Sequence, residues 1–270
     1  MISAGSARGV RPPILDQIDR VRRQQRALFR GRFAAVWIGL IGLLVLGLWL
    51  TDNIDMAWMG EWGPFIVGGT WTTVWISVVS MLLAIVLAVF GALGRLSSNP
   101  IPNGLAALYV SFVRGTPLIV QIFILYFALP QVGIRMEAEV AGVLGLAFNY
   151  GAYMTEIFRA GIQAVPRGQR EAAEALGMPE RQVLRRIVLP QAVRIVIPAI
   201  GNDFIAMIKD SALVSTIAVQ ELLWRARAAG TQTFNTLQAF LLAALVYWIV
   251  TIVFSFFQER LERRMARGDR

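Results

Sequence analysis

Cysteine and histidine are both absent from this chain of 270 residues, and Lys209 is its only lysine. Without them the chain can form no disulfide, thiol nucleophile, cysteine–histidine zinc site or Ser-His-Asp triad. Few of its 17 acidic residues lie inside apolar segments, so little is left from which to build an enzyme. We therefore expect no catalytic residue, no metal site and no cofactor.

Apolar residues, in contrast, make up 56% of the chain, and its mean hydropathy is +0.59. They gather into runs close to the ~20 residues that cross the ~30 Å hydrocarbon core of a bilayer. A shorter apolar piece, 212–223, is either re-entrant or interfacial. The predicted fold class is all-α, a polytopic membrane protein with about six transmembrane helices. The predicted spans are about 33–50, 70–93, 105–129, 140–160, 191–208 and 237–257.

The net charge of +9 is carried almost entirely by arginine, and the arginines cluster beside the apolar runs. This distribution is typical of membrane proteins, in which basic residues flank the transmembrane segments on the cytoplasmic side. It argues against a nucleic-acid partner. With a cytoplasmic N-terminus, 19 basic residues fall in cytoplasmic segments and four in external ones. Because basic residues favour the cytoplasmic side, we expect both termini, including the tail 261–270, to be cytoplasmic.

The N-terminal tail, residues 1–32, is polar and rich in arginine. Its stretch 14–30 is either an amphipathic helix on an anionic membrane surface or a disordered tail. The run that follows, 33–51, is too long for the apolar part of a signal peptide, and no small-residue cleavage site follows it. We interpret 33–51 as an uncleaved first transmembrane helix.

A cytoplasmic segment between the fourth and fifth spans, 167–190, has strong local signals. Its first part, 168–176, is rich in helix formers, and Gly177 can adopt the left-handed conformation that ends a helix. Pro179 suits the first turn of a second helix, and Pro190 marks a bend where the chain re-enters the membrane. The segment therefore predicts a helical hairpin whose small apolar residues allow a partner surface to approach closely.

The same segment carries a long motif: Glu-Ala-Ala, three residues, Gly, nine residues, Ile-x-Leu-Pro. This pattern resembles the signature of the permease subunits of ABC importers. In that family the hairpin sits in a cleft of the ATPase subunit and transmits ATP-driven closure to the membrane helices. The resemblance implies the same coupling role for the matching residues, Glu171, Ala172, Ala173, Gly177, Ile187, Leu189 and Pro190.

Four further segments are similar to permeases for polar amino acids of the histidine, glutamine and arginine type: 111–121, 151–163, 189–194 and 209–213. The resemblance covers about 65–260, a core of five spans, and leaves the tail and the first helix outside. It implies a permease in the bacterial inner membrane that forms the pathway for polar amino acids. It also implies three kinds of partner: ABC ATPase subunits, a second permease in a homodimer or heterodimer, and a periplasmic or extracellular solute-binding protein.

The energy for transport has to come from elsewhere. Lys209 follows Ala206-Met207-Ile208 rather than a glycine, so the chain contains no phosphate-binding P-loop. A separate ATPase would then supply it. The alternative is a secondary, ion-coupled amino-acid transporter that works through Glu156 or Asp203. Such transporters are usually built from internal repeats, and no repeat is apparent here.

Candidate substrate ligands lie on the fourth span, where Asn149, Tyr153 and Glu156 share one helix face. Intramembrane polar groups are costly and usually functional, and a carboxylate there suits the ammonium group of an amino acid. The alternative is that Glu156 pairs with a nearby arginine, such as Arg159 or Arg114, or lies in water near the cytoplasmic boundary.

Two other places are candidates for gating. Arg114, Gly115, Thr116 and Pro117 interrupt the third span, and the kink either borders a transport site or is purely structural. A polar cluster lies around the outer end of the fifth span, and it either gates the pathway, contacts a binding protein or pairs internally. Its members are Asn202, Asp203, Lys209 and Asp210.

Overall fold

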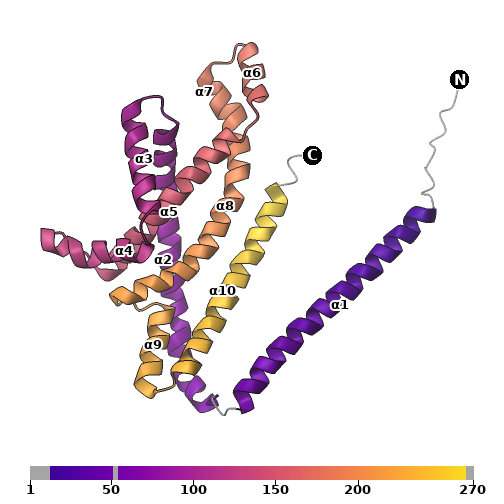
Figure 1. The fold of residues 1–270 in the computed structure, drawn as a ribbon, viewed down its shortest axis with the longest axis vertical. Helices are drawn as coiled ribbons and strands as arrows, with labels where there is room; N and C mark the ends of the chain where they lie inside the picture. Colours follow the sequence, from indigo (N-terminus) through magenta and orange to yellow (C-terminus); the bar gives the residue numbers. More distant parts are fainter. Residues whose placement is uncertain (1–12, 51–53, 266–270) are drawn as a thin grey trace. The chain divides into compact units, whose positions relative to one another are not determined.

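The computed structural model describes residues 13–50 and 54–265, which form helices joined by short turns, with no strand among them (Figure 1). Residues 1–12 of the predicted tail and 266–270 of the C-terminal tail lie outside the described residues. The chain divides into two units, residues 1–56 and 57–270. The all-α prediction is confirmed for the described part.

The first unit is the helix α1, Pro13–Leu50. It is continuous for 38 residues, so part of the predicted tail and the predicted first span belong to one helix. At 1.5 Å per residue it is about 57 Å long, roughly twice the hydrocarbon thickness of a bilayer. Its described side chains are exposed, large apolar ones included.

The second unit begins with α2, Met56–Leu96, which starts well before the predicted span and contains Pro64. The remaining elements follow along the chain. They are α3 Pro100–Arg114, α4 Leu118–Phe123, the π-helix η1 Ile124–Ala128, the 3₁₀-helix η2 Leu129–Val132, α5 Ala138–Gln163, α6 Arg167–Ala175, α7 Glu180–Val183, the π-helix η3 Leu184–Val188, α8 Leu189–Asp210, the 3₁₀-helix η4 Ser211–Ile217, α9 Leu222–Thr233 and α10 Thr236–Met265.

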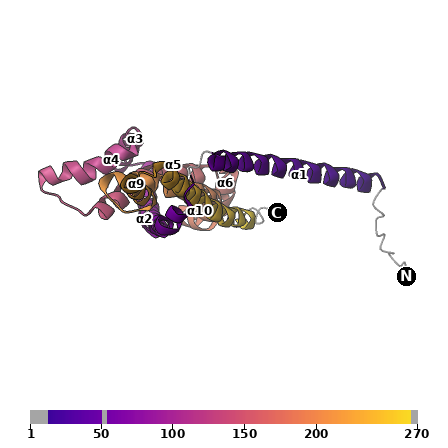
Figure 2. The same ribbon diagram turned by 90° about the horizontal axis from the view of Figure 1, so that it is seen from below.

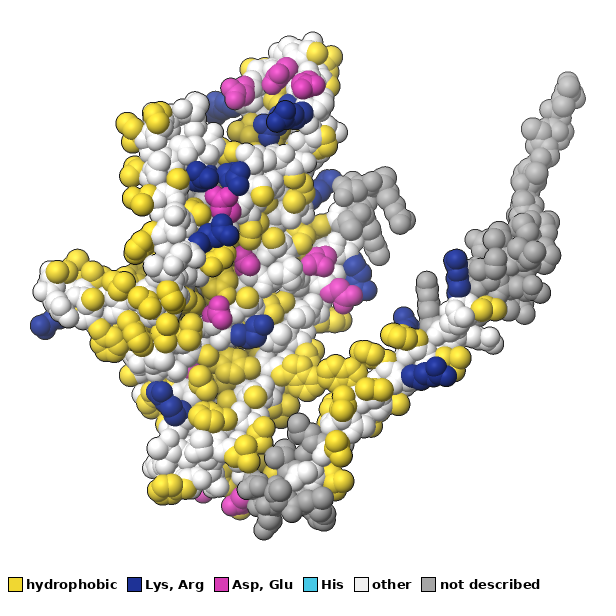
Figure 3. Space-filling view, in the orientation of Figure 1, with side chains coloured by type: hydrophobic (Ala, Val, Ile, Leu, Met, Phe, Trp, Pro, Cys, Tyr) yellow, Lys and Arg dark blue, Asp and Glu magenta, His cyan; other side chains and the backbone are white. Residues whose placement is uncertain are grey.

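The third span, predicted over 105–129, is interrupted at 114–117 as expected. The chain breaks after α3, and the path from α4 to Val132 is bent by 104° from α3. Thr116 and Pro117 lie in the break, since proline cannot supply the backbone donor that would continue α3. Figure 3 shows apolar side chains crowded over the α4–η2 segment, as expected for a surface in lipid.

Two of the described helices, α2 and α10, are long and apolar enough by themselves to span a membrane, and the bent α3–η2 pair would make a third. The number of six crossings therefore stays a prediction. The predicted spans 140–160 and 191–208 correspond to the helices α5 and α8. Charged side chains along α5 and α8 lower their hydropathy.

The main core lies where α5 packs between α2 and α8, and glycines let these helices approach closely. A Cβ at Gly91 would collide with the Thr155 hydroxyl, and one at Gly161 would collide with a Val196 methyl. Small residues at helix contacts are how helices pack in a membrane, where lipid is as apolar as leucine.

A second core joins α2, α9 and α10, and the last two lie side by side in both views (Figures 1 and 2). Trp58 on α2 donates its indole N–H to the Thr233 hydroxyl at 2.8 Å, near the α9–α10 turn. This turn lies at the end of the core opposite the α6–α7 hairpin (Figure 1).

The helical hairpin predicted in 167–190 is confirmed. Gly177 has φ +76°, and the Met178 N–H donates to the Ala173 carbonyl at 3.1 Å, which closes α6. Pro179 precedes α7 as its N-cap rather than lying inside its first turn. Pro190 lies in the first turn of α8, directly after the π-helix η3.

Candidate functional site

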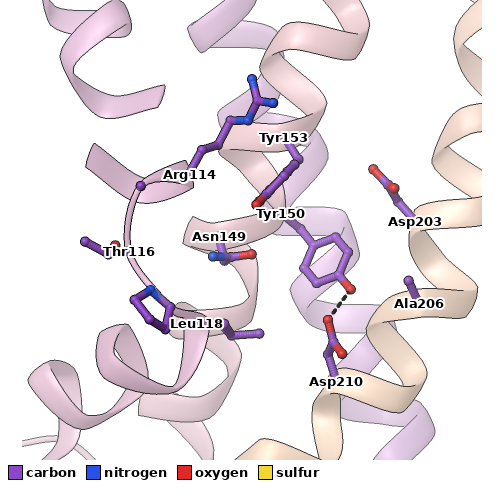
Figure 4. Close-up of a pocket in the computed structure, with 11 residues that line it drawn as sticks. Arg114, Thr116, Leu118, Asn149, Tyr150, Tyr153, Asp203, Ala206 and Asp210 are labelled. Carbon is purple, nitrogen blue, oxygen red and sulfur yellow. Dashed lines mark hydrogen bonds between the residues drawn. The ribbon is translucent and has the colours of Figure 1, made fainter. Parts of the chain in front are cut away.

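A cavity of about 540 Å³ opens where the break between α3 and α4 faces α5 and α8 (Figure 4). Its walls therefore come from three stretches far apart in the sequence. They comprise Arg114, Gly115, Thr116, Pro117, Leu118, Asn149, Tyr150, Tyr153, Asp203, Ala206 and Asp210. Its volume falls in the roughly 300–1,000 Å³ range of small-molecule sites.

The break is stabilised by Gln121, a buried residue of α4. Its side-chain amide donates to the Val113 carbonyl at 2.8 Å and to the Thr116 carbonyl at 3.1 Å. These bonds add donors to backbone carbonyls at the interrupted end of α3, and membrane-embedded backbone needs such partners. The side-chain oxygen of Gln121, Oε1, in turn accepts from the Asn149 side-chain amide at 3.2 Å, so the break and α5 form one wall.

Asn149 and Tyr153 lie one turn apart on the face of α5 that their spacing predicted, and both line the cavity. Asn149 is buried, whereas Tyr153 is 42% exposed and carries the Arg114 guanidinium over its ring at 5.1 Å. Tyr150, which the sequence analysis did not single out, donates its hydroxyl to Asp210 Oδ2 at 2.7 Å. This bond joins α5 to the end of α8.

Asp203 and Asp210 lie on the α8 side of the cavity. Asp203 Oδ2 is buried and accepts no hydrogen bond from any described residue. Within the described part of the chain, neither carboxylate nor Arg114 forms an ion pair. Figure 4 shows Arg114 and Asp210 toward opposite ends of the cavity, with Asn149 and Tyr150 between them.

Glu156 does not line the cavity. Its carboxylate forms ion pairs with Arg95 on α2 at 3.2 Å and with Arg159 at 2.7 Å. The pair with Arg159 was one of the open alternatives, whereas Arg114 lies over Tyr153 instead. Arg95, which is 61 residues away along the chain, was not anticipated.

The polar cluster predicted at the end of α8 divides in the structure. Asp203 and Asp210 line the cavity, whereas Asn202 and Lys209 are exposed and lie outside the lining.

The hairpin motif also separates into an inner and an outer set. Ala173 is buried in a small core with Val183 and Val188, and Ile187 packs against that core. Glu171 and Ala172 are exposed, and Leu176 is 83% exposed. Acidic side chains gather over α6 and α7 on the face drawn in Figure 3. The outer set is therefore available to a partner.

Comparison with known proteins agrees with this geometry. The family model described as "Binding-protein-dependent transport system inner membrane component" matches residues 81–267. The chain is 39% identical to the probable amino-acid ABC transporter permease protein YckA of Bacillus subtilis, over 75% of this chain and 90% of that protein. It is 38% identical to the arginine transport system permease protein ArtQ of B. subtilis, over 80% of this chain and all of that protein.

A solved structure extends the likeness to the fold. The crystal structure of an amino acid ABC transporter with histidines has a chain 36% identical to this one, with a TM-score of 0.75. The match covers 78% of this chain and 99% of that chain. The chain therefore belongs to the binding-protein-dependent transport system inner membrane components, and within them to the permease subunits of amino-acid ABC transporters.

Proposed function

We propose that this permease and a second permease subunit form the pathway by which an ATP-driven importer carries polar amino acids across the bacterial inner membrane. A relative named for arginine transport supports this substrate class, as does a cavity lined by charged and amide side chains. The chain performs no catalysis of its own in this proposal. ABC ATPase subunits hydrolyse ATP, and a solute-binding protein delivers the amino acid from outside.

The observation that carries the proposal is the path of the chain through the hairpin. α5 supplies Asn149 and Tyr153 to the cavity, α6 and α7 follow α5, and α7 continues through η3 into α8, which supplies Asp203 and Asp210. A displacement of the hairpin therefore reaches the α8 wall of the cavity through continuous helix, and the α5 wall across the short turn 164–166. This is the mechanical connection that an ATPase-driven permease needs.

In the cavity, the amino acid is recognised by its charged backbone groups. Arg114 offers a planar guanidinium, which binds carboxylates well, to the α-carboxylate. Asp210, fixed by the Tyr150 hydroxyl at 2.7 Å, accepts the α-ammonium group at the other end. The Asn149 amide and the Tyr153 hydroxyl lie along α5 as further polar contacts, and Gly115, Thr116 and Pro117 form the wall at the break between α3 and α4.

The hairpin docks on the ATPase through its outer set, Glu171, Ala172 and Leu176. Gly177 and Ala173 give the hairpin its shape, and Ile187, Leu189 and Pro190 connect it to α8. A carboxylate and small side chains at the tip allow both a charged contact and close approach.

The test is to purify the permease with its ATPase and to change Glu171 to Ala and Gly177 to Val in separate variants. We expect loss of complex formation or of transport-linked ATP hydrolysis, because φ +76° is unfavourable for a β-branched residue. Glu259→Gln, an exposed carboxylate change on α10, is the matched control and should behave as wild type. Hairpin variants that assemble and hydrolyse ATP normally would refute the coupling role. Uptake driven by an ion gradient without ATP would instead indicate a secondary transporter.

A further inference from the structure

The charges around the cavity do not balance. Among its described lining residues, Arg114 is the only cation, whereas Asp203 and Asp210 are both carboxylates. The lining therefore carries a net charge of −1 when all three are ionised. Unpaired charge at membrane depth is costly, so this imbalance calls for a partner.

No described residue supplies that partner. Arg95 and Arg159 are the neighbouring cations on α2 and α5, but both are paired with Glu156, and none of these three lines the cavity. Lys209 precedes Asp210 in the sequence, yet it is exposed and lies outside the lining. The chain thus leaves one carboxylate of the cavity without a positive neighbour.

The two carboxylates differ in their surroundings. Asp210 accepts the Tyr150 hydroxyl at 2.7 Å and is held in place. Asp203, two turns earlier on the same helix face, has a buried oxygen, Oδ2, that accepts no hydrogen bond from the described residues. A buried acceptor without a donor is unfavourable unless something else supplies one. Asp203 is therefore the carboxylate that lacks a partner.

A neutral amino acid would not correct this imbalance. It brings one α-carboxylate and one α-ammonium group, which satisfy Arg114 and one aspartate and leave the other aspartate uncompensated. An amino acid with a cationic side chain brings one more positive charge and balances all three groups. Because charge-assisted hydrogen bonds are stronger than neutral ones, the difference in affinity should be large.

We propose that the cavity selects amino acids with a cationic side chain, and that Asp203 is the specificity-determining residue that binds this cation. The inference rests on the proposed function, since it concerns the same cavity, and it names the substrate class. Neutral polar amino acids bind more weakly, and acidic ones are disfavoured by the excess negative charge.

The experiment measures binding to the purified permease–ATPase complex without solute-binding protein, because that protein imposes a selectivity of its own. Radiolabelled L-arginine and L-glutamine are the probes. We expect wild type to bind L-arginine at least about tenfold more tightly, which corresponds to about 1.4 kcal/mol. Asp203→Asn should weaken L-arginine binding about tenfold and change L-glutamine binding less than about twofold.

Two further variants separate a specific role from a general defect. Asp203→Glu keeps the charge and should keep the preference for L-arginine. Glu139→Gln removes an exposed carboxylate of α5 outside the cavity and should bind both probes like wild type. Each variant must elute as an intact complex.

Equal affinities for the two probes in wild type, or equal losses for both in Asp203→Asn, would overturn the inference. A complex that imports L-glutamine with ATP in preference to L-arginine would also overturn it, while leaving the amino-acid importer intact. A complex that binds and imports neither probe would refute the proposed function itself.

Discussion

Glu221 is a carboxylate with no exposed surface, and it joins three helices of the second core. One oxygen accepts the Trp224 backbone N–H at 2.7 Å and so caps α9. The other accepts the Tyr247 hydroxyl of α10 at 2.5 Å and the Thr73 hydroxyl of α2 at 3.3 Å. Both oxygens accept hydrogen bonds within the protein, so Glu221 links the helices of the second core.

Replacing Glu221 by Ala should leave the Thr73 and Tyr247 hydroxyls and the Trp224 N–H without their partner. Buried groups left unsatisfied cost about 1–3 kcal/mol, so we expect a marked fall in the thermal unfolding midpoint of the purified permease. Glu259→Ala is the control, since its ion pair with Arg263 at 3.2 Å is exposed and should contribute about 0–1 kcal/mol. Equal midpoints for the two variants would contradict this account of Glu221.

Glu156 raises a different question, because the sequence suggested a substrate ligand and the structure shows a carboxylate shared by two arginines. In Glu156→Gln, Arg95 and Arg159 lose their counter-charge next to the cavity wall. We expect ATP-driven uptake to fall about tenfold, since removal of one partner from a partly buried pair leaves uncompensated charge. Amino-acid binding to the purified complex should change much less. The interpretation of Glu156 as a ligand stays a prediction that this measurement decides.

A compensating change makes the test sharper. In the double variant with Arg95→Gln and Glu156→Gln, both members of the α2–α5 pair are neutral, so part of the lost uptake should return. A loss of amino-acid binding as large as the loss of uptake would place Glu156 in the substrate site instead.

At the scale of the elements, the sequence was most informative where the chemistry is local. Gly177 and the prolines beside it determine backbone conformation within a few residues, so the hairpin and the break at Pro117 could both be located. The direction of the chain after the break could not be predicted from the sequence. It depends on the contact of the Gln121 side chain with Asn149, which is 28 residues away. The predicted span 70–93 does not mark where α2 begins, because the earlier part of α2 packs Trp58 and Ile66 against α9 and α10.

Helix contacts make a further prediction about two glycines of α2. A Cβ at Gly69 would lie 2.7 Å from the Leu222 Cα and 2.8 Å from its backbone nitrogen, whereas nothing lies within 4 Å of one at Gly60. Gly69→Ala should therefore force α2 and α9 apart at a cost of about 1–3 kcal/mol. Gly60→Ala should be neutral or stabilising by up to about 1 kcal/mol, through helix propensity. Thermal unfolding of the two variants measures the difference, and similar midpoints would show that the α2–α9 contact is loose.

For the whole molecule, the cavity could be anticipated only in pieces. Asn149 and Tyr153 were identified as candidate ligands from their spacing. Arg114 was identified as a gating candidate because it lies at the break in the third span, and Asp210 because it lies in the polar cluster at the end of α8. Only the packing of α5 against α8 shows that they line one space. Hydropathy alone also fails to count the transmembrane helices. Helices that line a polar pathway carry charged residues, and these lower the mean hydropathy of the helix.

The proposed orientation in the membrane can be tested by labelling single cysteines. Because the chain contains no cysteine, an introduced one is the only thiol that can react. Leu176 at the hairpin and Phe234 at the α9–α10 turn are 83% and 94% exposed, and these two features lie at opposite ends of the core (Figure 1). In intact cells, a membrane-impermeant maleimide should label Phe234→Cys at once, whereas Leu176→Cys should react only after the membrane is opened. The basic residues near the hairpin favour the cytoplasm, so the reverse pattern would contradict both the topology and ATPase docking at the hairpin. Labelling of both sites from outside would mean that the core between them does not cross the membrane.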